Sequence, residues 1–265
     1  MAGEIRFESQ DTLLVVTLSQ PGRFNAMSRV MWQQLRTGFE HLRQDTALRC
    51  VLVRGDDGHF CAGGDIAEYA QFRFDPDHLR DFHENLVWGA LQAMRDCDVP
   101  LLAEIGGNCF GAGLEIASCC DIRIAAASAR FAAPIARLGF PMAPRELELV
   151  LSQVGATAAR QMLLEAAVFD APRMLQLGFL GHMVDDAQLQ AHVLATEQRI
   201  RALAPKAARM NKRLIRVLNP SADTSGSPGS SGALAQLVAN AYDYADSSEH
   251  REGIAAFVAK RKPVF

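Results

Sequence analysis

The stretch that decides the fold spans residues 106–115 and reads Gly106-Gly107-Asn108-Cys109-Phe110-Gly111-Ala112-Gly113-Leu114-Glu115. An apolar run at residues 99–105 precedes it, and a second strand-like run follows at residues 122–126. An apolar run ended by glycine is typical of a buried strand, and small residues before a helix leave backbone N–H groups open to a ligand. The stretch therefore predicts a strand, a tight turn and a helix beginning near Gly111, with another strand behind it.

The same order of elements occurs earlier in the chain. Residues 13–18 form a β-branched run, a helix is expected from an N-cap at Ser28 up to Arg43, and residues 50–53 form a second buried strand. A further helical pattern lies at residues 78–96. Strands joined by helical crossovers pair in parallel. The sequence therefore predicts an α/β fold with a mainly parallel sheet covered by helices.

The last third of the chain differs from the first two. Residues 143–218 show no convincing strand pattern and are rich in Ala, Leu, Met, Gln and Arg, which favour helix. The Ser- and Gly-rich segment 221–232 cannot bury enough apolar surface to order itself, so we expect a flexible loop there. A final helical pattern lies at residues 249–261. We expect a core over residues 1–200 and a helical region over residues 201–265.

The composition excludes several classes of partner. The 265 residues are 49% hydrophobic and carry a net charge of −3, so no basic field attracts nucleic acid or an anionic membrane. No run approaches the roughly 18 apolar residues of a membrane span, and residues 1–10 lack the pattern of a secretory signal. The six cysteines lie mostly in apolar runs without C-x-x-C spacing, which predicts buried thiols. We expect a cytoplasmic protein that binds neither nucleic acid nor membrane.

A second Gly-rich loop, residues 59–66, follows the strand expected at residues 50–53. Two such loops can aim two backbone N–H donors at one carbonyl oxygen, which is how a developing oxyanion is stabilised. The dinucleotide-binding fingerprint needs a third glycine where this chain has Ile116, and neither loop carries the Lys-Ser/Thr of a phosphate-binding P-loop. The two loops therefore favour oxyanion chemistry over nucleotide binding.

Both loops resemble motifs of the crotonase superfamily of enoyl-CoA hydratases and isomerases. Residues 60–66 are similar to its first oxyanion loop, F-x-A-G-x-D-I, and residues 107–121 to its second, G-x-x-x-G-x-G-x-E-x-A-x-x-x-D. Similar segments at residues 20–27, 171–180 and 249–263 extend the resemblance over most of the chain. It implies a crotonase-type ββα spiral core and a helical C-terminal region that builds a homotrimer or homohexamer. It also implies an acyl-CoA substrate, with coenzyme A as part of that substrate, no permanently bound cofactor and no metal.

The resemblance further implies which residues hold the substrate. The backbone N–H groups of Gly64 and Ala112 would form the oxyanion hole, where only the main chain matters and a small side chain is acceptable. The residues expected to contact coenzyme A are Arg23, Ala62, Gly63, Asp65, Ile66, Gly111, Pro134, Phe257 and Lys260. For Lys260, a solvated position at a helix end is the alternative.

Glu115 is the candidate acid/base. It lies three residues beyond Ala112 on the same expected helix, so its side chain shares a face with the second oxyanion amide. Its apolar neighbours Leu114 and Ile116 form a setting that raises the pKa of a carboxyl group toward neutrality. A structural carboxylate with a satisfied partner is the alternative.

The chain departs from the family at the second acid/base position. Hydratases of the family carry a glutamate after a proline, where this chain has Ile135. Met142 and Ala143 occupy the positions where related isomerases, decarboxylases or dehalogenases place a polar group. None of these three side chains transfers a proton, which puts efficient hydration in doubt.

Polar residues near this departure are possible substitutes. Arg145, Glu146 and Glu148 open the next expected helix, and we name Glu146 as the possible second acid/base. An acid in a first helical turn is also an ordinary partner of the helix dipole. His83 and Tyr69, in the stretch after the first loop, are further candidates.

Residues and resemblance together predict an acyl-CoA enzyme of the enoyl-CoA hydratase or isomerase type, which stabilises a thioester enolate in an oxyanion hole. One alternative is another thioester reaction of the superfamily, hydrolysis or decarboxylation, at the same hole. Another is a catalytically silent acyl-CoA-binding protein, which the inert Ile135, Met142 and Ala143 would suit.

Overall fold

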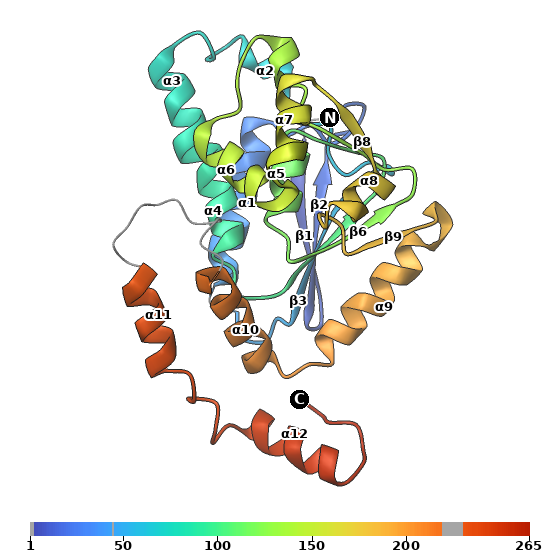
Figure 1. The fold of residues 1–265 in the computed structure, drawn as a ribbon, viewed down its shortest axis with the longest axis vertical. Coiled ribbons are helices and arrows are strands. Elements are labelled where there is room, and N and C mark those ends of the chain that lie inside the picture. The colour runs from blue at the N-terminus through green and yellow to red at the C-terminus, as the bar shows by residue number, and fades with distance from the viewer. Residues whose placement is uncertain (1–2, 44, 219–229) are drawn as a thin grey trace.

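A six-stranded sheet forms the centre of the molecule (Figure 1). The computed structural model describes residues 3–43, 45–218 and 230–265. In spatial order the strands are β1 (Glu4–Gln10), β2 (Leu13–Ser19), β3 (Cys50–Gly55), β4 (Leu101–Ile105), β6 (Ile122–Ala126) and β9 (His182–Val184). All neighbours pair in parallel except β1 and β2, which form an antiparallel pair. The predicted α/β fold with a mainly parallel sheet is confirmed, although the sequence did not reveal β1.

Helices cover both faces of this sheet. Alternate residues of β2 enter two separate hydrophobic clusters, one beneath α1 (Arg29–Leu42) and α4 (Trp88–Arg95), the other beneath α9 (Leu189–Arg201). Strand side chains alternate between faces, so a strand covered on both sides must be apolar along its whole length. This requirement explains the continuous apolar run that identified β2 in the sequence.

Helix α1 begins and ends where its sequence pattern predicts. The Ser28 side chain accepts a hydrogen bond from the N–H of Met31 at 3.2 Å, and Arg43 closes the C-terminus. The buried side chains recur at helical spacing and form one stripe toward the core; they are Met31, Trp32, Leu35 and Phe39.

The helix predicted at residues 78–96 is divided into segments. Between α3 (Pro76–Asp81) and α4 lies a π-helix, η1 (Phe82–Val87). The wider turn of a π-helix changes which side chains share a face, and such turns often occur at functional sites. Here it lets Phe82, His83 and Val87 line one cavity.

A second sheet consists of β5 (Asn108–Phe110), β7 (Arg130–Ala132) and β8 (Val168–Asp170). The prediction that residues 143–218 contain no strand is wrong, because β8 and β9 both lie there. Each has three residues, too few to show the alternation that marks a strand. Strand β5 likewise occupies part of what the sequence predicted as a tight turn.

Further helical segments lie around the two sheets and in the C-terminal part. They are α2 (Ile66–Tyr69), α5 (Ala112–Ser118), η2 (Ile135–Leu138), α6 (Pro144–Val154), α7 (Ala156–Leu164), α8 (Ala171–Gln176), η3 (Asp186–Gln188), α10 (Pro205–Leu218), α11 (Ser230–Ala239) and α12 (Ser248–Val258). Across the described ranges, no helix is both long and apolar enough to cross a bilayer.

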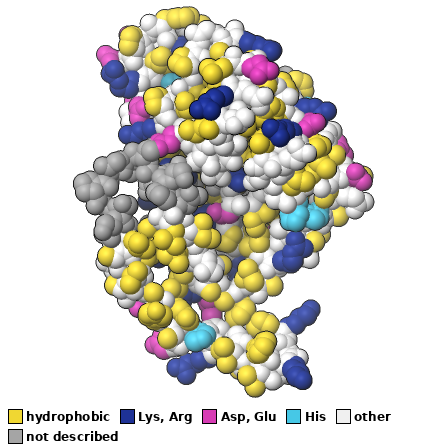
Figure 2. Space-filling model, viewed as in Figure 1, with side chains coloured by type: hydrophobic (Ala, Val, Ile, Leu, Met, Phe, Trp, Pro, Cys, Tyr) yellow, Lys and Arg dark blue, Asp and Glu magenta, His cyan; other side chains and the backbone are white. Residues whose placement is uncertain are grey.

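Helices α11 and α12 extend away from the sheet toward one end of the molecule (Figure 1). Figure 2 shows hydrophobic side chains gathered over both helices; the exposed ones include Val238, Ile254, Phe257 and Val258. The predicted final helix is present as α12, three residues shorter at its C-terminal end than the pattern at residues 249–261. The flexible loop predicted at residues 221–232 lies mostly outside the described residues.

The six cysteines are free and buried, as their apolar neighbours predict. Burial raises the pKa of Cys61, in the first Gly-rich loop, to about 12, because water no longer stabilises the thiolate. A thiol with such a pKa is a poor nucleophile at neutral pH. Cys61 therefore acts as a small apolar residue of the core.

Candidate active site

The two Gly-rich loops meet and bond to each other like neighbouring strands. The N–H of Cys61 donates to the carbonyl oxygen of Asn108, and the N–H of Phe110 donates to that of Cys61, each at 2.9 Å. Gly113 packs against this junction, where a Cβ atom would lie 2.6 Å from the Cys61 carbonyl oxygen. Glycine at this position therefore lets the second loop approach the first.

Gly64 and Ala112 present backbone N–H groups from the two loops. Ala112 is the first residue of α5, where an N–H has no partner within the helix. The preceding Gly111 has a φ of 47°, a left-handed conformation that favours glycine. Among the described residues, neither the Gly64 nor the Ala112 N–H donates a hydrogen bond, and both residues line one cavity. The loops thus offer two donors to one ligand oxygen.

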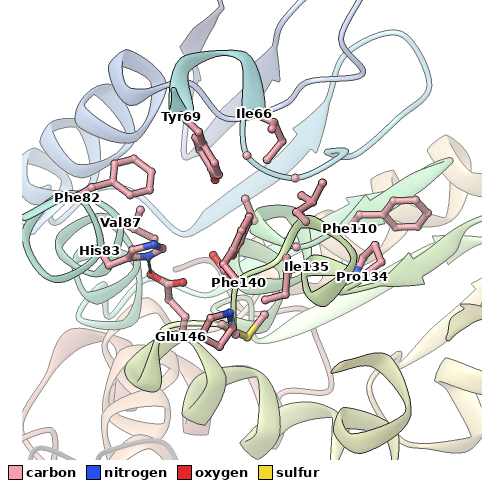
Figure 3. A pocket seen from close by; sticks show the side chains of 18 of the residues that line it. Ile66, Tyr69, Phe82, His83, Val87, Phe110, Pro134, Ile135, Phe140 and Glu146 are labelled. Carbon is pink, nitrogen blue, oxygen red and sulfur yellow. Dashed lines mark hydrogen bonds and ion pairs between the residues drawn. The ribbon is translucent and has the colours of Figure 1, made fainter. Parts of the chain in front are cut away.

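The cavity beside these amides is small, about 130 Å³, and mostly apolar (Figure 3). Its apolar walls come from α1, residues 66–87 and residues 110–142; they are Trp32, Ile66, Phe82, Val87, Phe110, Pro134, Ile135, Leu138, Phe140, Pro141 and Met142. The ionisable and hydroxyl side chains in the wall belong to Tyr69, His83, Glu115 and Glu146. In such an apolar setting, charges interact more strongly than in water.

Glu115 lies on α5 three residues after Ala112 and lines the cavity at 6% exposure. Burial raises the pKa of its carboxyl group well above the ordinary range, and the negative charge of Glu146 raises it further. This direction agrees with the expectation from its apolar neighbours. A carboxyl group with a raised pKa keeps its proton to higher pH and can serve as an acid.

Two of the three apolar residues that depart from the family pattern line the site. Ile135, at the start of η2, and Met142, just before α6, both line the cavity. Ala143 occupies the N-cap position of α6 and is not part of the wall. Ile135 and Met142 therefore contribute apolar side chains, and no titratable group, to the wall.

Glu146 brings a second carboxyl group to the cavity from the first turn of α6. The residue is 4% exposed, and its Oε1 lies 2.7 Å from Nδ1 of His83 (Figure 3). Burial raises the pKa of Glu146 to about 8, while the Arg73 guanidinium opposes this shift. Glu115 and Glu146, from two separate helices, thus share one apolar cavity.

The two neighbours of Glu146 that were considered with it do not reach the cavity. Arg145 forms an ion pair with Glu84, with Nε 3.0 Å from Oε2. Glu148 is half-buried on another side of α6 and does not line the wall. Of the three polar residues that open α6, Glu146 is the one that the fold directs into the site.

The residues expected to contact coenzyme A separate into three groups. Those that line the cavity are Ala62, Gly63, Ile66, Gly111 and Pro134. Asp65 lies behind the loop, where it caps α2 and pairs with Arg23, whose side chain is 50% exposed. The last two, Phe257 and Lys260, do not join the cavity of this chain, because α12 lies at the opposite end of the molecule from α2 (Figure 1).

Two further polar groups lie at or near the cavity, the Tyr69 hydroxyl in its wall and the Arg73 guanidinium against the wall residue Phe140. A Cβ atom on Gly64 would lie 2.1 Å from the Tyr69 hydroxyl oxygen, so this hydroxyl sits beside the first amide. The guanidinium carbon of Arg73 lies 3.6 Å from the centre of the Phe140 ring. The sequence names Tyr69 and His83 as candidates but misses Arg73. The position of Arg73 between Phe72 and Phe74 is a signal that could have identified it as a candidate, because arginine packs well on aromatic rings.

The sequence of this chain matches one known protein family over nearly its whole length. A profile of the enoyl-CoA hydratase/isomerase family matches residues 8–265. A probable enoyl-CoA hydratase of Rhodobacter capsulatus is 30% identical over 267 residues, which cover 98% of this chain and 97% of that protein. The 2,3-dehydroadipyl-CoA hydratase of Escherichia coli is 27% identical over 262 residues, which cover 99% of this chain and 98% of that enzyme.

Solved structures resemble the chain over its whole length. A protein described as an enoyl-CoA hydratase/carnithine racemase from Magnetospirillum magneticum has a TM-score of 0.89 at 35% identity, covering 98% of this chain and 94% of that one. AtuE of Pseudomonas aeruginosa has a TM-score of 0.86 at 32% identity, covering 98% of each chain.

Proposed function

Because the chain belongs to the enoyl-CoA hydratase/isomerase family, it is an enzyme of the hydratase or isomerase type, and we propose that it protonates and deprotonates enoyl-CoA thioesters with two glutamates of unusual arrangement. The observation that carries this proposal is one apolar cavity lined by two amides without partners in the described chain and by two carboxyl groups.

The amides of Gly64 and Ala112 are proposed to bind the thioester oxygen. This oxygen gains negative charge when the acyl group becomes an enolate, and fixed N–H donors stabilise that charge more than they stabilise the substrate. Removing one such donor typically costs about 3–4 kcal/mol of transition-state stabilisation. Both groups belong to the backbone, so the side chain of Ala112 has no part in this step.

Glu115 and Glu146 are proposed to move the protons. In hydration, the water oxygen bonds to the β carbon while a base takes a proton from the water. The electron pair of the double bond moves toward the thioester oxygen, and the α carbon then receives a proton from an acid. Two carboxyl groups supply both roles, so Glu146 would replace the glutamate that the family carries where this chain has Ile135. Isomerisation moves one proton between the α and γ carbons and needs one of the two.

Coenzyme A is proposed to enter as part of the substrate, with no permanently bound cofactor. Its thioester end would lie along Ala62, Gly63, Ile66, Gly111 and Pro134, which line the cavity. The half-exposed Arg23 carries a positive charge beside this loop, and its pairing with Asp65 orders both side chains. An arginine near the loop suits the coenzyme's phosphates.

Residues 201–265 are proposed to assemble the chain into a homotrimer or homohexamer, with residues 1–200 as the core. Exposed apolar side chains on the last helices, among them Ile254 and Phe257, support this proposal because assembly would cover them. In an assembly, Phe257 and Lys260 would contact coenzyme A bound to another copy. Light scattering that finds a monomer would contradict both statements.

Two alternatives have less support. Hydrolysis through His83 as a base is disfavoured, because its Nε2 lies 3.2 Å from Nη1 of Arg73 and so is already engaged. A silent binder was suggested by Ile135, but Glu146 supplies a carboxyl group to the same cavity. No residue of the described wall specifically favours decarboxylation.

The test compares wild type with Glu115→Gln and Glu146→Gln on crotonyl-CoA and a 3-enoyl-CoA. We expect both substitutions to abolish most hydration, because each removes one of the two proton-transferring groups. Glu148→Gln is the matched control, since Glu148 lies on the same helix as Glu146 outside the cavity. Binding of these thioesters without turnover or α-proton exchange with solvent would support the silent binder. Full activity in Glu146→Gln would reject the role of that residue.

A further inference from the structure

The two carboxyl groups of the cavity differ in their hydrogen-bond partners. Glu146 Oε1 lies 2.7 Å from Nδ1 of His83. No side-chain hydrogen bond or ion pair of Glu115 is found within the described parts of the chain, although Glu146 and His83 line the same cavity. A donor on one carboxyl group and none on the other stabilises the ionised form of the first only.

The position of the ring proton on His83 follows from its second contact. Nε2 of His83 lies 3.2 Å from Nη1 of Arg73. A guanidinium group only donates hydrogen bonds, so Nε2 must accept. A neutral imidazole has one donor and one acceptor, which leaves the proton on Nδ1, where it is donated to Glu146. Burial and the positive charge of Arg73 lower the pKa of His83 to about 4, so the ring is neutral at physiological pH.

Packing holds Arg73 and His83 in this geometry. The Arg73 guanidinium lies over the rings of Phe140 and Tyr69, at 3.6 Å and 4.6 Å from their centres. The His83 ring stands edge-on to Phe82, with 5.0 Å between the ring centres. Within the described residues Arg73 has no ion pair with a carboxylate. The His83 ring contacts both Glu146 and Arg73, and the Arg73 guanidinium lowers the pKa of Glu146, so it favours a negative charge on that carboxyl group.

From this asymmetry we propose that Arg73 and His83 are positioning residues that make Glu146 the first of the two carboxyl groups to ionise, while Glu115 keeps its proton. Glu146 then acts as the base and Glu115 as the acid. The catalytic roles rest on the proposed function, whereas the order of ionisation is a property of the protein alone.

The surrounding charges agree with this order. Glu146 contacts His83 of η1 and feels the positive charge of Arg73, while the negative charge of Glu84, also on η1, is paired with Arg145 of α6. Burial raises the pKa of Glu146 to about 8. Glu115 faces Glu146 from α6, the His83 ring, the Tyr69 hydroxyl and the Cys61 thiol, none of which is a cation at neutral pH.

The order of ionisation assigns each proton in hydration. The ionised Glu146 takes a proton from water as the water oxygen bonds to the β carbon. The enolate then takes the proton of Glu115 at its α carbon. Glu146 ends protonated and Glu115 ionised, and one proton passing from Glu146 to Glu115 through the solvent of the cavity restores the starting state. No other reactant is consumed.

The test is a pH titration of protein carrying ¹³C in its glutamate carboxyl groups, followed by NMR in the absence of substrate. Two variants isolate the buried groups: Glu115→Gln leaves Glu146, and Glu146→Gln leaves Glu115. We expect the group left in Glu115→Gln to titrate at lower pH than the group left in Glu146→Gln. The reverse order would overturn the proposal.

The contribution of His83 is measured in the Glu115→Gln background. His83→Phe removes the hydrogen-bond donor and should raise the midpoint pH of the Glu146 titration by about one pH unit or more. His83→Asn is the matched variant, because its amide can place an N–H near the position of Nδ1, and it should keep the titration near its original pH. Equal titrations in the two variants would contradict the role of His83. If His83→Phe does not fold, the comparison is made between Arg73→Met and Arg73→Lys. Arg73→Met removes the positive charge and should also raise the midpoint pH at which Glu146 titrates, whereas Arg73→Lys keeps the charge.

Turnover assays on the same proteins separate this inference from the proposed function. If Glu146 ionises first and no enoyl-CoA is converted, the ionisation order stands and the proposed function fails. If enoyl-CoAs are converted but Glu115 ionises first, the proposed function stands and the inference is wrong.

Discussion

The cavity has two walls that are built differently. One, the amide wall, consists of the backbone N–H groups of Gly64 and Ala112 on two loops that bond directly to each other. The other, the carboxylate wall, consists of Glu115, Glu146 and His83, which come from α5, α6 and the π-helix η1. The first depends on main-chain geometry and the second on side chains that meet across the fold.

This difference shows where such a site tolerates change. The amide wall needs small residues and a close approach of two loops, residues 59–66 and 106–113, which are separate in sequence and bond to each other in the fold. The carboxylate wall takes its two carboxyl groups from two different helices, Glu115 from α5 and Glu146 from α6. In this chain the start of η2 contributes Ile135 to the cavity, and the first turn of α6 contributes the carboxyl group of Glu146.

The carboxylate wall should show the largest effect on catalysis. Glu115→Gln should lower kcat/KM for crotonyl-CoA hydration by about 10²–10⁴-fold, because a general acid or base contributes that much. In the double variant Glu115→Gln with Glu146→Gln, the loss should be far smaller than the product of the two single losses, since residues that act as a unit are not additive. Steady-state kinetics of the three variants measure this. Multiplicative losses would show that the two groups act independently.

The amide wall should respond to backbone displacement and not to side-chain loss. Gly113→Ala places a Cβ atom 2.6 Å from the Cys61 carbonyl oxygen, so the loops must separate. We expect kcat/KM to fall by about 10²-fold, comparable to the loss of one oxyanion donor. Ala112→Gly keeps the N–H and should stay within a few-fold of wild type. Equal activity in the two variants would mean that loop contact does not set the amide geometry.

The charge of the carboxylate wall should also select among acyl groups. No lysine or arginine lines the described cavity, and Glu146, once ionised above its pKa of about 8, repels a second carboxylate. Hexenoyl-CoA should therefore exceed 2,3-dehydroadipyl-CoA in kcat/KM by about tenfold or more. Competition between the two thioesters in one assay measures the ratio directly. A preference for the dicarboxylic substrate would contradict this prediction. It would mean that a cation from outside the described cavity lies near the acyl end of the substrate.

The smallest expected effect is on stability, and its sign depends on pH. Glu146 has a folded-state pKa of about 8 and an ordinary value near 4.5, so between these values the folded protein binds a proton that the unfolded chain lacks. Stability from this group is complete below pH 4.5 and falls as pH rises through 8. Glu146→Gln should therefore raise Tm by roughly 2–4 °C at pH 8 and by less at pH 5. Calorimetry at the two pH values decides; a larger gain at pH 5 would reverse the sign.

Much of the fold could be predicted from local patterns. The continuous apolar runs of β2 and β3 and the Ser28 cap of α1 are determined by residues close together in sequence. The three-residue strands β8 and β9 could not be predicted, because neighbouring strands stabilise them and their own pattern is too short. The π-helix η1 was missed for a related reason, since its sequence pattern is that of an ordinary helix.

The sequence by itself predicted the two amides of the amide wall, the position of Glu115 on the helix behind Ala112, and an apolar residue, Ile135, where the family pattern has an acid. Glu115 and Ile135 were placed within single segments, where chain connectivity sets the geometry, whereas the amide wall was predicted from two Gly-rich motifs, residues 59–66 and 106–115, that only the fold brings together. Only the tertiary structure decided that Glu146 enters the cavity and that Arg73 and His83 meet it there. His83 and Glu146 are 63 residues apart, so their contact depends on how η1 packs against α6. Spacing within either segment carries no information about that packing, because it is set by the core between them.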